Sequence, residues 1–116
     1  MKKLLGIVVL CLLWCNVGNT EEKCIKLIDY DALKFSSNDQ FDQYSWKAEF
    51  ENLCDRDLYL TVDFFFYSED DFLLQKDWKD DVPISAKTKK IISNNVLLIR
   101  DVADKFRKMG VKYKYK

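Results

Sequence analysis

The four cysteines carry the most specific chemistry of this 116-residue sequence. Cys11 and Cys15 lie in an apolar N-terminal run, whereas Cys24 and Cys54 lie in the rest of the chain. In an oxidising compartment an even number of cysteines forms structural disulfides, and the Cys-x-x-Cys spacing of redox pairs is absent. We therefore predict a Cys24–Cys54 disulfide that adds about 3 to 4 kcal/mol on the chain-entropy model. Two free thiols or a redox pair are the alternatives.

Histidine is absent from the whole sequence. Its absence removes the commonest general base, the Ser–His and Cys–His nucleophile pairs and the usual zinc or copper ligand. A glycosidase-type pair needs only two carboxylates. However, Glu49, Glu51 and Asp63 fall on the polar face of predicted strands, where exposure gives no reason for a raised pKa. The sequence therefore predicts no catalytic residue, no cofactor and no enzymatic activity.

Six acidic residues and one tryptophan are the candidate binding residues: Glu69, Asp70, Asp71, Asp77, Asp80, Asp81 and Trp78. The acidic residues lack the Asp-x-Asp-x-Asp-Gly order of a calcium loop, so no metal site is predicted and solvated turns are the simpler interpretation. If the two acidic loops lie side by side at one end of the fold, they would form a weak calcium site. An aromatic residue in a polar loop, such as Trp78, either anchors a partner or, more commonly, folds back over the end of the domain.

The N-terminus has the three regions of a secretory signal peptide. Two lysines precede an apolar run from Leu4 to Trp14, and small and polar residues follow. The run is too short to span a membrane, which needs about 20 apolar residues. We predict a signal peptide over residues 1–20, one mature domain over residues 21–116 without an integral membrane segment, and a periplasmic or secreted location. Lipidation of Cys15 is the alternative, although a tryptophan precedes it where such sites need a small residue.

Charge is unevenly distributed along the predicted mature domain. Residues 21–116 hold 17 basic and 19 acidic side chains, and this near balance gives no reason to expect nucleic acid as a partner. Residues 87–116, however, hold 10 basic and only 2 acidic side chains. We expect these basic residues to pair with acidic strands across a sheet, and a basic docking surface is the alternative.

Alternation of apolar and polar residues predicts consecutive β-strands in the middle of the chain. Trp46, Ala48 and Phe50 share one face of the first of these strands. The alternation continues over residues 58–67 in a strand with the pattern of a central strand. The turn formers at residues 68–71 then predict a hairpin with the apolar residues that follow.

The remaining strands are predicted from shorter patterns. One strand begins the mature domain, before a polar loop. Because Pro83 lacks a ladder donor, the polar segment that ends there is a loop or the start of an edge strand. Two further strands, at residues 89–93 and 96–99, are separated by Asn94 and Asn95.

One helix interrupts the β pattern near the C-terminus. Asp101 is a good N-cap and Gly110 a good stop, with basic side chains in the last turn between them. We predict a helix over residues 101–109 and a final strand over residues 111–116, with the tyrosines of that strand facing inward. The apolar side of the helix would cover the outer aromatic residues of the central strand, which are Tyr59, Phe65 and Tyr67.

These elements favour an all-β antiparallel sandwich with one short helix. Three segments resemble the immunoglobulin-like FxLYD-type domains of bacterial envelope proteins: Ala48-x-Phe50-x-Asn52, residues 58–74 with their acidic turn, and residues 84–91. The resemblance covers residues 46–91 and departs from the family at Ser85-Ala86-Lys87, where a Pro-Gly turn is usual. It implies an Ig-like β-sandwich without an active site that acts as an interaction module.

The sequence thus predicts an exported, non-catalytic envelope protein. Its expected partner is another envelope protein, which the sequence does not identify. The alternative is a periplasmic carrier of a small ligand or of calcium that uses the acidic loops.

Overall fold

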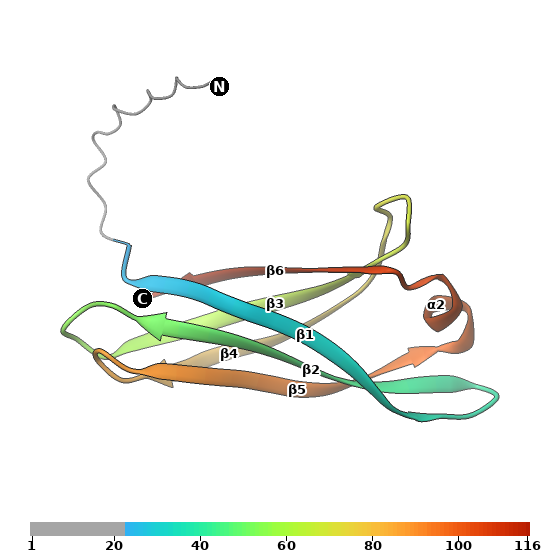
Figure 1. Cartoon of the computed structure of the whole chain (residues 1–116), viewed down its shortest axis with the longest axis horizontal. Helices are drawn as coiled ribbons and strands as arrows, with labels where there is room; N and C mark the ends of the chain where they lie inside the picture. Colours follow the sequence, from blue (N-terminus) through green and yellow to red (C-terminus); the bar gives the residue numbers. More distant parts are fainter. Residues whose placement is uncertain (1–22) are drawn as a thin grey trace, which may run out of the picture.

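The computed structural model describes residues 23–116 and contains two three-stranded antiparallel sheets packed face to face (Figure 1). The predicted signal peptide and Cys15 lie outside the described residues. The predicted all-β sandwich with one short helix near the C-terminus is confirmed. No helix in the described range is long and apolar enough to cross a membrane. The elements are β1 (Ile25–Ser37), β2 (Phe41–Asn52), β3 (Leu58–Tyr67), β4 (Leu73–Ile84), β5 (Lys89–Ile99), α2 (Arg100–Lys105) and β6 (Lys108–Tyr115).

Each sheet consists of one hairpin, which supplies an edge strand and the middle strand, and of one strand that arrives from the other sheet. The strand orders are β1-β2-β5 and β4-β3-β6, so β2 and β3 are the two middle strands. The predicted hairpin turn at residues 68–71 is confirmed as the connection between β3 and β4. The α2 helix and this turn lie at one end of the sandwich, and the start of β1 and the C-terminus lie at the other (Figure 1).

The core lies between the inner faces of β2 and β3. Every second side chain of β3, from Leu58 to Phe66, is at most 1% exposed, which confirms the predicted alternation. Trp46 of β2 is fully buried, and its ring stacks on Phe64 with 4.9 Å between the ring centroids. Large aromatic side chains that interdigitate between two sheets contribute much of the apolar burial of a small sandwich.

Asn52 ends β2 as a fully buried polar residue. Its side-chain amide donates to the backbone carbonyls of Arg56, Ile84 and Ser85 at 2.8, 3.1 and 3.3 Å. Its Oδ1 accepts from the backbone N–H of Cys54 at 2.9 Å. Because a buried amide needs partners, this side chain fixes the connection from β2 to β3 against the end of β4.

Two predictions for the segments that follow the hairpin are wrong in part. The polar segment before Pro83 is not a loop but belongs to β4, which is an edge strand as the second alternative predicts. Pro83, however, lies near the end of this strand and not at its start. Asn94 and Asn95 do not separate two strands but lie within the single strand β5. The strand continues there because the Asn94 side chain donates a hydrogen bond to Asp77 Oδ2 at 2.9 Å. This bond gives the side-chain amide of a residue typical of turns a partner inside the sandwich.

The helix is shorter than predicted. It begins at Arg100, after an extended residue that provides no side-chain cap, so Asp101 is not the N-cap. Gly110 does not stop the helix but lies inside β6. The ring of Tyr67 lies against this glycine, since a Cβ added there would be 3.2 Å from Tyr67 Cε2.

The helix also lies at another place than predicted. Phe106, directly after α2, packs between the sheets against Tyr44 and Phe66, with ring centroids 5.3 and 5.1 Å apart. Ala103 is buried at the same end. The prediction that the helix covers the outer aromatic residues of β3 is therefore wrong, because its apolar residues close the end of the core.

Candidate functional site

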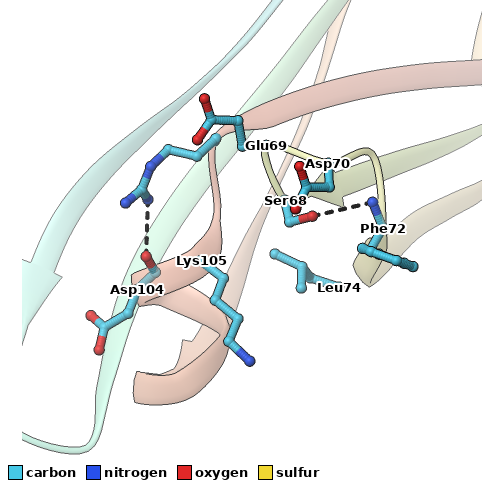
Figure 2. Close-up of a pocket in the computed structure, with 8 residues that line it drawn as sticks. Ser68, Glu69, Asp70, Phe72, Leu74, Asp104 and Lys105 are labelled. Atoms are coloured by element: carbon cyan, nitrogen blue, oxygen red, sulfur yellow. Dashed lines mark hydrogen bonds between the residues drawn. The ribbon is translucent and has the colours of Figure 1, made fainter.

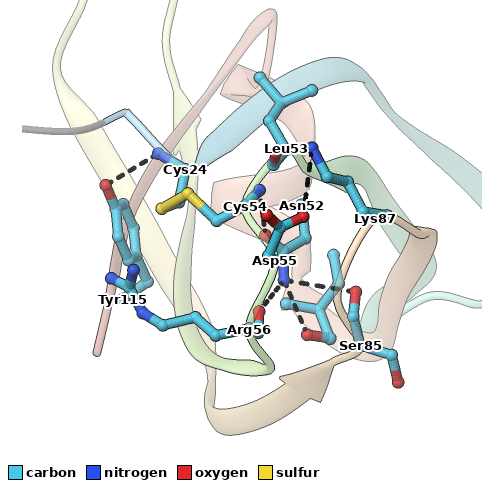
Figure 3. Close-up of a disulfide and its surroundings, with 10 residues drawn as sticks. Cys24, Asn52, Leu53, Cys54, Asp55, Arg56, Ser85, Lys87 and Tyr115 are labelled. Atoms are coloured by element: carbon cyan, nitrogen blue, oxygen red, sulfur yellow. Dashed lines mark hydrogen bonds and ion pairs between the residues drawn. A yellow bond between two sulfur atoms is a disulfide. The ribbon is translucent and has the colours of Figure 1, made fainter.

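Cys24 and Cys54 form the predicted disulfide, near the start of β1 (Figure 3). Their Cα atoms are 5.1 Å apart, within the usual range for a bridge. Cys24 is fully buried, and its N–H donates to the Tyr115 hydroxyl at 3.1 Å. A bridge with one fully buried cysteine, between the start of β1 and the β2–β3 connection, is typical of a structural crosslink rather than of a reactive pair.

An open cleft of about 430 Å³ separates the β3–β4 turn from α2 (Figure 2). Its charged lining is mixed, and most of its side chains are exposed. Arg107 donates hydrogen bonds to the backbone carbonyls of Asp104 and Phe106 at 2.9 and 2.7 Å. Its guanidinium thus caps the C-terminal end of the helix. Glu69 and Asp70 of the turn line the cleft and are exposed.

The two acidic runs do not lie side by side. Asp71 accepts a hydrogen bond from Lys108 Nζ at 3.0 Å, and Asp81 lies 3.4 Å from Lys116 Nζ. These two lysines are eight positions apart on an extended segment, a span of about 26 Å. Within residues 23–116, no three acidic or cysteine side chains come close enough together to hold a metal ion.

Asp77 is directed into the sandwich rather than into solvent. Its Oδ2 accepts hydrogen bonds from Trp46 Nε1 at 2.7 Å and from Asn94 Nδ2 at 2.9 Å. A buried indole N–H needs an acceptor, and this carboxylate provides it from the facing sheet. The contact is therefore a tie between the sheets.

Asp80 and Asp81 form a β-bulge in β4 opposite Thr61. The register shifts there, and Asp81 has a φ of 53°, which aspartate tolerates better than most residues. The bulge bends β4 away from regular pairing at the edge of its sheet. Asp80 and Asp81 thus have a structural role in the bulge.

Asp42 and Arg100 form an ion pair that the sequence analysis does not predict. Asp42 is 3% exposed, and its Oδ1 lies 2.8 Å from Arg100 Nη2. Hydrogen bonds from Arg100 and then from Ser37 lower the pKa of Asp42 below its ordinary value, although burial opposes them. The same bond to Asp42 raises the pKa of Arg100. The pair ties the start of α2 to β2.

A cluster of aromatic and lysine side chains lies on the outer face of the β4-β3-β6 sheet. We call it the aromatic–lysine face, and its members are Tyr59, Phe65, Tyr67, Lys76, Trp78, Lys112 and Lys114. Trp78 is 52% exposed and Tyr59 is 50% exposed. Trp78 does not fold back over the end of the domain but stands on the strand opposite Asp63.

Lysine ammonium groups lie over two rings of this face. Lys76 Nζ is 5.6 Å from the centroid of a Trp78 ring, and Lys112 Nζ is 5.8 Å from that of Phe65. Both distances are typical of cation–π contacts. These contacts place the lysine ammonium groups at defined positions on the sheet. The aromatic–lysine face is therefore our candidate surface for binding another molecule.

The basic C-terminal third pairs with acids only in part. Lys108 contacts Asp71, Lys116 contacts Asp81, and Lys112 lies opposite Asp63, as cross-strand pairing predicts. Lys114, by contrast, lies opposite the neutral Thr61. The face therefore keeps an excess of positive charge.

Comparison with known proteins identifies structures with a similar fold but does not identify a family. No family model matches the sequence, and no curated protein matches it. A glycoside hydrolase family 2 beta-glucuronidase has a similar region, with a TM-score of 0.55 and 11% identity over 60% of this chain and 7% of that chain. A Bacteroides uniformis beta-glucuronidase gives a TM-score of 0.52 and 18% identity over 60% of this chain and 8% of that chain.

A protein from Archaeoglobus fulgidus is similar over nearly its whole length. The TM-score is 0.52 with 6% identity, over 78% of this chain and 96% of that chain. Identities this low show a shared β-sandwich fold alone. The chain spans less than a tenth of the glucuronidases, so it resembles a β-sandwich domain of larger proteins. The resemblance to FxLYD-type domains stays a prediction.

Proposed function

We propose that this chain is an exported, non-catalytic β-sandwich module that binds another protein of the cell envelope through the aromatic–lysine face. The observation that carries the proposal is that Trp78 and Tyr59 are both about half-exposed on one sheet face, which α2 leaves uncovered. Exposed aromatic residues on a rigid sheet are the usual anchors of protein interfaces.

Export is supported by the bridge between Cys24 and Cys54. A structural disulfide in a domain this small is characteristic of oxidising compartments. The apolar N-terminal run supplies the corresponding signal. The resemblance to FxLYD-type domains also implies a binding role rather than a reaction.

A calcium carrier is the alternative function that the sequence leaves open. It would need the acidic runs to converge, whereas Asp71 and Asp81 contact lysines at opposite ends of β6 and Asp77 is directed inward. We therefore favour the binding module. A calcium carrier would show a higher melting temperature in millimolar calcium, and the binding module would not.

Site-specific photo-crosslinking tests the proposal. A photo-reactive amino acid replaces Trp78 in the exported protein, and the cells are irradiated before the envelope is extracted. We expect one discrete adduct. The matched control carries the same amino acid in place of Lys47, an exposed residue on the outer face of the other sheet.

The adduct must be specific to the face. Absence of an adduct at position 78, or the same adducts at both positions, would contradict the proposed function. Intact mass of the exported protein checks the compartment separately: the mature chain should be two hydrogens lighter than its reduced form. A full-length chain with free thiols would contradict export.

A further inference from the structure

We infer that the free edge of β6 accepts an extended acidic segment of a partner protein as an additional β-strand. The inference deepens the proposed function and rests on it. β6 is an edge strand, which pairs with β3 and with no other strand of the described chain. Edge strands present unpaired backbone groups that can pair with another chain.

The other edges of the sandwich are blocked. β4 carries Pro83 and the bulge at Asp80 and Asp81, which disrupt regular pairing. β5 lies beside β4, and the carbonyl of Leu97 accepts a hydrogen bond from Gln75 Nε2 at 3.1 Å.

β1 is blocked by its own side chains. The carboxylates of Asp29 and Asp31 accept hydrogen bonds from the backbone N–H groups of Tyr30 and Ala32, each at 2.8 Å. The strand also has two register shifts in its pairing with β2. Both features are among the devices that keep an edge from pairing.

β6 lacks the proline and the bulge of β4, and it contacts β1 near its C-terminal end, where the Cys24 N–H donates to the Tyr115 hydroxyl. Its register with β3 runs without a shift from Lys108 to Tyr115, and it contains no proline. Tyr59 and Lys116 exchange both backbone hydrogen bonds, at 2.9 and 3.1 Å. Since bonded and non-bonded residues alternate in an antiparallel pair, the backbone groups of Val111 and Tyr113 point away from β3, toward the open edge.

Charge selects the kind of strand that this edge accepts. Lys112 and Lys114 lie on the outer face at alternate positions, about 7 Å apart. An added strand with acidic residues at alternate positions would place its carboxylates beside these ammonium groups, because directly opposite residues share a face. A second β6 would bring lysine against lysine and is disfavoured by the same argument.

A strand is favoured over a polyanion that stacks on the rings. Lys76 and Lys112 already lie over the rings of Trp78 and Phe65, so these ring faces support ammonium groups rather than offering free stacking surfaces. The outward backbone N–H and C=O groups of Val111 and Tyr113 need partners with the spacing of a β-strand backbone. Phosphate and glycan chains do not have this spacing.

The test uses a peptide as long as β6 in which glutamate alternates with threonine. At a peptide concentration ten times the dissociation constant, amide exchange at Val111 and Tyr113 should slow about tenfold, because only the free fraction exchanges. Lys112 and Lys114, whose amides already face β3, should change little. Equal slowing along the whole strand, or none, would overturn the inference.

Two further probes separate strand pairing from charge. A peptide of the same sequence with methylated backbone nitrogens on its pairing edge should bind at least about tenfold more weakly, since it loses the backbone hydrogen bonds to β6. Inorganic polyphosphate should not slow exchange at Val111 and Tyr113. If the methylated peptide binds as tightly as the unmodified one, or if polyphosphate slows exchange equally, binding depends on charge alone and the inference fails.

A charge reversal supplies the matched variants. The double variant Lys112→Glu/Lys114→Glu should lose the acidic peptide and gain a peptide that alternates lysine with threonine. The control Lys89→Glu/Lys90→Glu on β5 makes the same change in net charge and should keep the acidic peptide. Equal loss in both variants would overturn the inference, and gain of the basic peptide shows that the first variant is folded.

Sedimentation of the protein alone tests for a second copy as the occupant. We expect a monomer, and a dimer that Lys112→Glu/Lys114→Glu dissociates would overturn the inference in favour of self-pairing. The outcome is separable from the proposed function. Peptide binding without an envelope adduct at position 78 contradicts only the proposed function, and an adduct without peptide binding contradicts only this inference.

Discussion

Asp42 shows how one side chain joins three elements. It lies on the inner face of β2, accepts one hydrogen bond from Arg100 at the start of α2, and accepts another from Ser37 at the end of β1. An acid at an inner position needs a cation nearby. Alternation along β2 indicates the inner position from the sequence, but it cannot indicate that Arg100, 58 residues away, supplies the charge.

Acid should weaken the fold through this residue. The pKa of Asp42 is lowered in the folded state, so its contribution to stability is present above its ordinary value of 3.8 and is lost as the pH falls toward the lower folded value. In Asp42→Asn, the unfolding free energy measured by urea denaturation should depend less on pH below about 4 than in the unchanged protein.

Asp39→Asn, at an exposed neighbouring loop position, is the control for this titration. It should keep the pH dependence of the unchanged protein. An Asp42→Asn variant with the same acid slope as the unchanged protein would contradict the assigned role of the Asp42–Arg100 pair.

At the scale of elements, alternation was a good guide for β3 and a poor one for the segments after it. The strict alternation of residues 58–67 is reproduced in burial because one face of β3 packs against the other sheet and the opposite face meets solvent. Asn94 is polar and typical of turns, yet it lies in a continuous strand because Asp77 on the facing sheet accepts its hydrogen bond. That partner comes from tertiary contact.

Adjacent phenylalanines on β3 should differ sharply in their effect on stability. Phe64 is fully buried and stacks on Trp46, whereas Phe65 lies on the partly exposed outer face. Phe64→Ala should lower the unfolding free energy by about 3 to 5 kcal/mol, and Phe65→Ala by about 1 kcal/mol. Chemical denaturation of both variants measures the difference, and equal losses would contradict the register of β3.

The whole molecule is held at one end by the disulfide and at the other by α2. Cys24–Cys54 closes a segment with a sequence separation of 30, which contains the entire β1–β2 hairpin. Phe106 closes the opposite end of the core against Tyr44 and Phe66. The two sheets between these ends are joined by packing and by polar ties such as Trp46 to Asp77.

Removal of the disulfide should destabilise the whole domain. Cys24→Ser/Cys54→Ser should lower the unfolding free energy by about 3 to 4 kcal/mol, because the unfolded chain gains the entropy of an open loop. Denaturation of the unchanged protein with a reductant should show the same loss, whereas the variant should be insensitive to it. A reductant without effect on the unchanged protein would contradict a disulfide in solution.

The sequence by itself determined the class of fold, the alternating strands β2 and β3, and the cysteine pair. These follow from local alternation and from residue chemistry, which need no knowledge of distant partners. Only the tertiary structure decided that α2 closes the end of the core, that the acidic runs lie apart, and that β6 keeps an open edge. Each depends on which residues meet across the two sheets. Alternation along a strand indicates the face on which a side chain lies, but it does not indicate which residue lies opposite that side chain.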